Sequence, residues 1–161
     1  MPTGPTITIR PATTRDAAFI RSLAPRFAAI GSPSWRDPER MAAFHTQGLA
    51  NTATLALEPA PGHAVLIAAD AEDRPLGFAH LHGEQSGLTG EEQGCLSTLA
   101  VTVDVEGRGI GQALLAAGEA WARARGYSLL ALETFGGNAH ARAFYGKRGY
   151  EEETLKLVKV L

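Results

Sequence analysis

A glycine-rich turn constrains the fold of this chain more than any other segment. Gly107, Gly109 and Gly111 follow a strand-like stretch, and after them apolar residues recur at helical spacing until Gly126. Glycines let backbone N–H groups approach a phosphate closely, and a helix N-terminus adds unpaired donors with partial positive charge. The turn matches neither the dinucleotide fingerprint nor the P-loop. It favours an α/β protein with a pyrophosphate site, although a glycine-rich turn without any ligand is the competing interpretation.

The other segments alternate between strand and helix patterns. Strands are predicted at 6–10, 63–69, 76–82, 95–103, 128–133 and 153–160. Helices are predicted from 13–16 to about 27, from 37–38 onward, from 110 to 126, and at 139–147. The short polar turn at 71–75 joins two strands as an antiparallel hairpin. This order predicts a single mixed, mostly antiparallel central sheet flanked by helices.

Composition limits the classes of function. A chain of 161 residues fits one domain, which we place at 1–161. The net charge of -2 argues against a general affinity for nucleic acid or for an anionic membrane, and no apolar run is long enough to span a bilayer. The single cysteine, Cys95, excludes an intramolecular disulfide and no secretory signal is visible, so we expect a cytoplasmic protein.

A second motif identifies a family. Residues 138–150 read N-x-x-A-x-x-F-Y-x-x-x-G-Y, and the chain opens with Ile9-Arg10-Pro11-Ala12-Thr13. Together with the glycine-rich turn and Leu76-Gly77-Phe78, these segments resemble the GCN5-related N-acetyltransferase (GNAT) family. The resemblance covers nearly the whole chain and is strongest from 96 to 150. It implies the GNAT acyltransferase fold, acetyl-CoA as co-substrate, direct attack by an amine of a small molecule or peptide, and a homodimer.

Two residues of the turn depart from the family pattern. Val103 stands where proline is common, and Glu106 stands where arginine or glutamine is usual. A solvated carboxylate beside a pyrophosphate repels it by about 1 kcal/mol or less, and Arg108 is a nearby cation that offsets it. Glu106 therefore leaves two alternatives open: another acyl-CoA donor, or a regulatory domain that binds acyl-CoA without turnover.

The resemblance also implies roles for individual residues. The strand around Leu99, Ala100 and Val101 would pair with the pantetheine arm and polarise the thioester. The amides that would hold the pyrophosphate belong to Arg108, Gly109, Ile110, Gly111 and Gln112. Further cofactor contacts would come from Asn138, Phe144 and Tyr145, of which Tyr145 would protonate the departing thiolate. Each of these last three has a structural alternative, because asparagine caps helices and aromatic side chains fill cores.

Two carboxylates compete for the role of general base. Glu133 lies twelve residues before Tyr145, a spacing at which some members of the family carry a catalytic glutamate. Glu84 shares one strand face with His80 and His82, and histidine suits base chemistry near neutral pH. That face is equally typical of a solvated strand. No metal site is expected, since the spacing suggests no third ligand beside the two histidines, and Cys95 lacks the flanking residues of a nucleophile.

Overall fold

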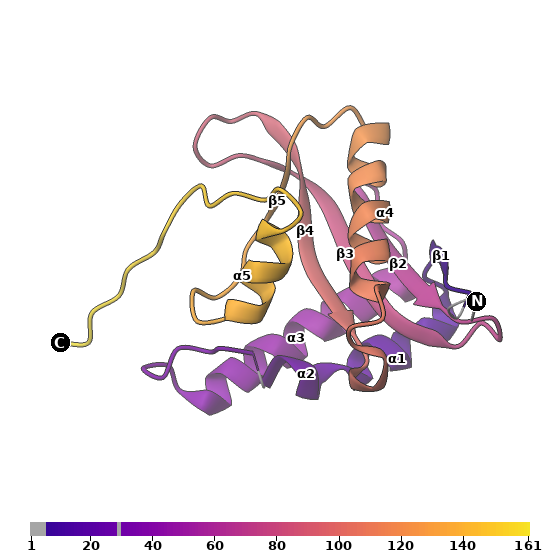
Figure 1. Ribbon diagram of the computed structural model, residues 1–161, viewed down its shortest axis with the longest axis horizontal. Helices are drawn as coiled ribbons and strands as arrows, with labels where there is room; N and C mark the ends of the chain where they lie inside the picture. Colours follow the sequence, from indigo (N-terminus) through magenta and orange to yellow (C-terminus); the bar gives the residue numbers. More distant parts are fainter. Residues whose placement is uncertain (1–5, 29) are drawn as a thin grey trace.

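One five-stranded sheet organises the molecule (Figure 1). In the computed structural model, which describes residues 6–28 and 30–161, the strand order is β1-β2-β3-β4-β5. The strands are β1 (Thr8–Pro11), β2 (His63–Ala69), β3 (Pro75–Gln85), β4 (Glu92–Val101) and β5 (Leu130–Leu132). All neighbours are antiparallel except β4 and β5, which run parallel. The predicted mixed, mostly antiparallel sheet and the hairpin between β2 and β3 are confirmed. Residues 1–5 of the expected domain lie outside the described residues.

Helices cover both faces of the sheet. They are α1 (Ala17–Ser22), α2 (Ala24–Ala28), α3 (Pro38–Leu57), α4 (Ile110–Ala124) and α5 (Ala139–Gly146). Ile20 of α1 and Ala53 of α3 pack with Ile67 and Phe78 against one face of the sheet. On the other face, Leu114 and its neighbours in α4 pack on Leu81 and Leu96, as expected from the alternation of side chains along a strand. None of the helices in the described part of the chain combines the length and the apolar character needed to span a bilayer.

The N-terminal helical region is divided where the sequence pattern suggested one helix. A 3-10 turn at Thr14–Asp16 leads into α1, and α2 starts after a break at Leu23. Pro25 explains the break, because it has no N–H for the helical ladder and its ring crowds the preceding turn. Apolar periodicity alone does not register this interruption, since both short helices present their apolar residues to the same core.

The strand predicted at 153–160 is wrong. Residues 151–161 form neither helix nor strand, and Figure 1 shows them extending away from the rest of the molecule. Their apolar side chains are exposed, Leu157 to 90%. Alternation shows which face a strand would bury, but a strand also needs a hydrogen-bonding neighbour, and β5 at this end of the sheet is only three residues long. Smaller differences concern β4, which stops at Val101 because Val103–Val105 form a 3-10 turn.

Candidate active site

Strands β4 and β5 separate part-way along their length. Their pairing covers Gly94 to Leu96 on β4 and Leu130 to Leu132 on β5, whereas β4 continues to Val101. Beyond Leu96, the described residues supply no strand on this side of β4. The backbone of Leu99, Ala100 and Val101 is therefore at a strand edge without a strand partner. Apart from the Val101 carbonyl, which accepts from Arg26, this edge offers hydrogen-bonding groups to an extended ligand.

A β-bulge lies at the same point. The register between β3 and β4 passes from His80–Thr98 to Leu81–Leu96, so Ser97 is the additional residue of β4. A bulge bends a strand and redirects its side chains, and bulges are frequent next to active sites. Here the Ser97 hydroxyl lies 2.7 Å from Nδ1 of His82 on the neighbouring strand.

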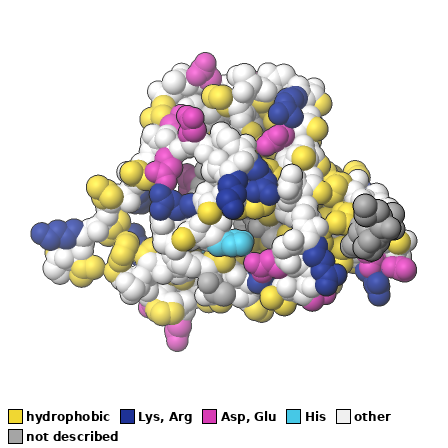
Figure 2. Space-filling view, viewed as in Figure 1, with side chains coloured by type: hydrophobic (Ala, Val, Ile, Leu, Met, Phe, Trp, Pro, Cys, Tyr) yellow, Lys and Arg dark blue, Asp and Glu magenta, His cyan; other side chains and the backbone are white. Residues whose placement is uncertain are grey.

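The glycine-rich turn presents the start of α4 to this gap. Gly109 is the N-cap and has φ of 81°, a left-handed conformation that favours glycine. The first hydrogen bond of α4 runs from the N–H of Ala113 to the carbonyl of Gly109, so the amides of Ile110, Gly111 and Gln112 precede the helical ladder. Figure 2 shows Lys and Arg side chains over the region between the start of α4 and α5. This end of α4 has the donors and the local charge that an anionic group requires.

Arg26, and not the expected Arg108, forms an ion pair with Glu106. Its carboxylate accepts a hydrogen bond from Arg26 of α2 at 2.6 Å, and the ring of His140 lies 3.7 Å away. Arg26 also donates from Nε to the carbonyl of Val101, 3.1 Å away, which ties α2 to the end of β4. No ion pair of the described residues joins Glu106 to Arg108. The predicted offset of the carboxylate therefore exists, but Arg26 supplies it.

Helix α5 brings its aromatic residues to the glycine-rich turn. A Cβ on Gly111 would lie 3.6 Å from the Phe144 ring and 3.7 Å from the Leu99 side chain, so three predicted cofactor residues meet here. Tyr145 packs on Phe144 and Tyr150, and burial raises its pKa to about 12, which keeps the hydroxyl protonated at neutral pH. Asn138 caps α5 by accepting a hydrogen bond from the N–H of Ala141 at 3.1 Å. The helix-capping role of Asn138 is thus confirmed, while a contact of its side chain with the cofactor stays a prediction.

The two competing carboxylates both lie near Cys95. Glu133 is exposed and directly follows the last residue of β5 that pairs with β4. Glu84, on β3, accepts a hydrogen bond from Gln93 at 2.9 Å. Burial and the negative charges of Glu84 and Glu133 raise the pKa of Cys95 to about 12. A thiol with that pKa is not a nucleophile near neutral pH, in agreement with the expected absence of a catalytic cysteine.

The structure brings a third histidine, which the sequence spacing did not indicate, to His80 and His82. His63 of β2 is the register partner of His82, and its Nδ1 lies 3.1 Å from Nε2 of His80. The spacing of His80 and His82 within one strand could not show this residue, which comes from the other strand of the hairpin. The predicted common face of His80, His82 and Glu84 is confirmed by the contact of 3.6 Å between His82 and Glu84.

Comparison with known proteins decides the family. The sequence profile of the Acetyltransferase (GNAT) family matches residues 25–150. The chain belongs to this family. An aminoglycoside N(6')-acetyltransferase type 1 from Stenotrophomonas maltophilia is 32% identical over 148 residues, which covers 90% of this chain and 86% of the relative. The GNAT membership and this relative make the protein an acetyl-CoA-dependent N-acetyltransferase.

Solved structures confirm the GNAT fold. A putative acetyl transferase from Pyrococcus furiosus superimposes with a TM-score of 0.72 at 21% identity, covering 97% of this chain and 100% of that one. The aminoglycoside N-acetyltransferase AAC(6')-Iy in complex with CoA gives a TM-score of 0.69 at 20% identity, covering 99% and 98%. At this level of identity the likeness concerns the fold, so the roles of single residues rest on the geometry above.

Three residues around the site were not found from the sequence of this GNAT protein. Arg26 is a helix residue far from Glu106 in sequence, and no pattern linked them. Ser97 is marked by the bulge, which a sequence does not reveal without the strand register. His63 was accessible in principle, because it stands as far before the hairpin turn as His82 stands after it.

Proposed function

We propose that this GNAT enzyme acetylates a primary amine of a small polar molecule by direct attack on acetyl-CoA. The observation that carries the proposal is the meeting of three features at one place. The open edge of β4, the unpaired amides at the start of α4, and the carboxylate of Glu133 all border the point where β4 and β5 separate, and Glu84 approaches Cys95 from the neighbouring strand β3. An acyl donor that occupies this gap has its thioester on the side of Glu133.

The cofactor half of the site binds an extended, anionic molecule. The pantetheine arm lies along the edge of Leu99, Ala100 and Val101, the part of β4 that β5 does not pair with, and adds to the sheet there. The pyrophosphate accepts hydrogen bonds from the amides of 109–112, whereas the predicted amide of Arg108 already donates to the carbonyl of Val105. The ion pair of Glu106 with Arg26 removes the feature that favoured a binding domain without turnover, so the catalytic interpretation is the stronger one.

Chemistry in this arrangement needs a base and an acid. Glu133 takes the proton of the substrate ammonium group, because it is the carboxylate at the mouth of the gap. The amine nitrogen then bonds to the thioester carbon, and a backbone amide near Ala100 or Val101 stabilises the developing oxyanion. When the carbon–sulfur bond breaks, Tyr145 gives its proton to the thiolate of CoA. Glu84 binds the cationic acceptor and orients it.

The acceptor class follows from charge and from the relatives. Glu84 and Glu133, two carboxylates near Cys95, favour a substrate with several ammonium groups over an acidic or neutral one. The relative from Stenotrophomonas maltophilia is an aminoglycoside N(6')-acetyltransferase, and the solved structures of similar fold include aminoglycoside acetyltransferases. We therefore propose an amino sugar of the aminoglycoside type as acceptor. Turnover with a basic peptide in place of the aminoglycoside would change the acceptor class to peptides.

The acceptor and the two carboxylates are tested together by measuring release of free CoA thiol. Purified enzyme is supplied with acetyl-CoA and, separately, with an aminoglycoside, an amino acid amide and a basic peptide. We expect turnover with the aminoglycoside, a fall in kcat of about 100-fold for Glu133→Gln, and an increase in KM with little change in kcat for Glu84→Gln. Equal kcat for Glu133→Gln and the wild type would remove Glu133 from the role of base.

We also propose a homodimer that uses the C-terminal segment. Leu155 and Leu157 are 72% and 90% exposed, and within the described residues β5 has one neighbouring strand, β4. The alternating pattern of 153–160 suits a strand that pairs with the sheet of a second copy. Light scattering after size exclusion should give a dimer for the wild type and a monomer for Leu155→Asp/Leu157→Asp. A wild-type monomer would contradict this assembly.

A further inference from the structure

Three histidine side chains gather on the α3 face of the sheet, away from the cofactor half of the site. His63 belongs to β2, and His80 and His82 belong to β3. Nδ1 of His63 lies 3.1 Å from Nε2 of His80, and one ring nitrogen of each histidine lies within 4.8 Å of the others. The three ring centroids are 5.4, 5.5 and 5.9 Å apart. We call these residues the histidine cluster.

Hydroxyl groups outside the cluster fix the orientation of two of its rings. Thr52 of α3 is buried, and its hydroxyl donates to the carbonyl of Gly48 at 3.2 Å. It therefore accepts from Nδ1–H of His80, 3.3 Å away, which leaves Nε2 of His80 with its lone pair toward His63. The Ser97 hydroxyl lies 2.7 Å from Nδ1 of His82; when it accepts from Nδ1–H, Nε2 of His82 carries a lone pair as well. Hydrogen bonds of this kind, to the second nitrogen of each ring, are typical of histidines that bind a metal ion.

The separations suit one ion of small radius. Zinc binds imidazole nitrogen at about 2.0–2.1 Å in tetrahedral geometry, which places neighbouring ligand nitrogens about 3.3 Å apart. The His63–His80 pair already has this separation, and His63 is exposed, so its ring can rotate toward His82. Glu84 approaches the cluster with its carboxylate 3.6 Å from Nε2 of His82 and offers a fourth ligand. Imidazole selects zinc, copper or nickel over magnesium and calcium, which prefer oxygen ligands.

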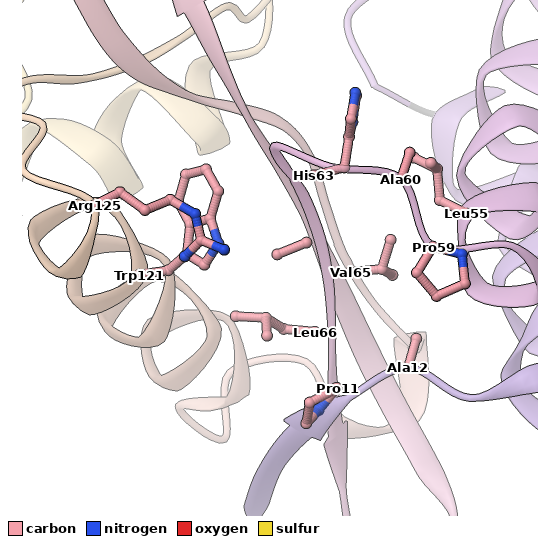
Figure 3. Close-up of a pocket in the computed structure, with 11 residues that line it drawn as sticks. Pro11, Ala12, Leu55, Pro59, Ala60, His63, Val65, Leu66, Trp121 and Arg125 are labelled. Atoms are coloured by element: carbon pink, nitrogen blue, oxygen red, sulfur yellow. The ribbon is translucent and has the colours of Figure 1, made fainter.

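An ion can reach the cluster from solvent. His63 borders a hollow of about 300 Å³ beside β2, lined also by residues of α3 and α4 (Figure 3). Figure 3 shows Trp121 and Arg125 on one side of β2 and Leu55, Pro59 and Ala60 on the other, with the ring of His63 directed away from Trp121. The exposed ring at this rim leads inward to His80, the deepest of the three.

We infer that His63, His80 and His82 form a binding site for a divalent transition-metal ion of the zinc class, with Glu84 or water as the fourth ligand. Without an ion, the rings of His63 and His80 stand at hydrogen-bond distance and the ring of His82 lies beside both. The ion replaces the proton shared between His63 and His80 and satisfies all three rings at once. The three histidines take no part in the proposed acetyl transfer, and Glu84 is the one residue that the metal site shares with the proposed acceptor site.

The test uses the full chain without a histidine tag, stripped with a chelator and titrated with Co²⁺. We expect one equivalent of Co²⁺ to bind with the strong visible absorption of a tetrahedral site, and Zn²⁺ to displace it. His63→Ala should weaken binding at least 100-fold, and Thr52→Val should weaken it about 10-fold through the lost hydrogen bond to His80. His140→Ala is the matched control, because His140 is an exposed histidine on α5.

The variants are compared first by thermal unfolding in the chelator, where His63→Ala should equal the wild type because its ring is exposed. Absence of the tetrahedral spectrum in the wild type overturns the proposal. So does an equal loss of affinity in His63→Ala and His140→Ala, because that result describes nonspecific binding to surface histidines.

Discussion

The ion pair of Arg26 with Glu106 should set the affinity for acetyl-CoA. Arg26 cancels a negative charge at the turn that binds the pyrophosphate, and the two side chains are 33% and 43% exposed. Replacing Arg26 by methionine keeps most of the apolar stem and leaves the charge of Glu106 uncompensated. Unit charges 4 Å apart interact by about 1 kcal/mol in water and about 4 kcal/mol near a protein surface. With this exposure we take the lower value, roughly a fivefold weaker Kd for Arg26→Met.

A double-mutant cycle separates charge from structure. Isothermal titration with acetyl-CoA is done on the wild type, Arg26→Met, Glu106→Gln and the double variant, with Arg21→Ala as a control for net charge. Arg21 is an exposed cation of α1. We expect Glu106→Gln to restore most of the affinity that Arg26→Met loses. If the double variant binds as weakly as Arg26→Met, the charge of Glu106 is not the cause and the reasoning fails.

Three further predictions concern the acid, the thiol and the fold. Tyr145→Phe should lower kcat about 100-fold with unchanged Kd for acetyl-CoA, and an unchanged kcat would exclude it as the acid. Cys95 should react with a disulfide reagent at pH 8 roughly 1000-fold more slowly in the native than in the unfolded protein, because its pKa is about 12; equal rates would contradict this. Asp16→Asn should lower the free energy of unfolding in urea by about 3 kcal/mol, since it removes the buried carboxylate that Arg10 contacts and leaves Arg10 paired with Asp73 alone. Burial raises the pKa of Asp16, but hydrogen bonds from Arg10 and Thr13 outweigh it and lower the pKa. The contribution is therefore complete above pH 4 and lost as the pH falls below, a loss that Asp16→Asn should not show.

Features that depend on residues close together in the sequence could be predicted from it. The hairpin of β2 and β3 was predicted from two apolar runs around a polar turn. The turn before α4 was predicted from its glycines, because Gly107 and Gly109 have a left-handed backbone conformation that favours glycine. The motif of 138–150 supplied the family, which the profile and the relatives confirmed.

Contacts between distant segments were not accessible in this way. The pairing of Arg26 with Glu106 depends on how α2 packs against the end of β4. The approach of Glu84 and Glu133 to Cys95 depends on the order of strands β3, β4 and β5 in the sheet. The strand prediction for 153–160 was wrong for a related reason. The alternation describes the side chains of the segment, whereas a strand also needs hydrogen bonds to the backbone of a neighbouring strand.

The most direct test of the central claim is titration calorimetry of the purified protein with acetyl-CoA and, in separate runs, with ATP and NAD. The open edge of β4 and the amides at the start of α4 predict micromolar binding of acetyl-CoA at one site per chain and no comparable heat with the other two nucleotides. Absence of acetyl-CoA binding, or equal binding of all three, would contradict a site built for the pantetheine arm and its pyrophosphate.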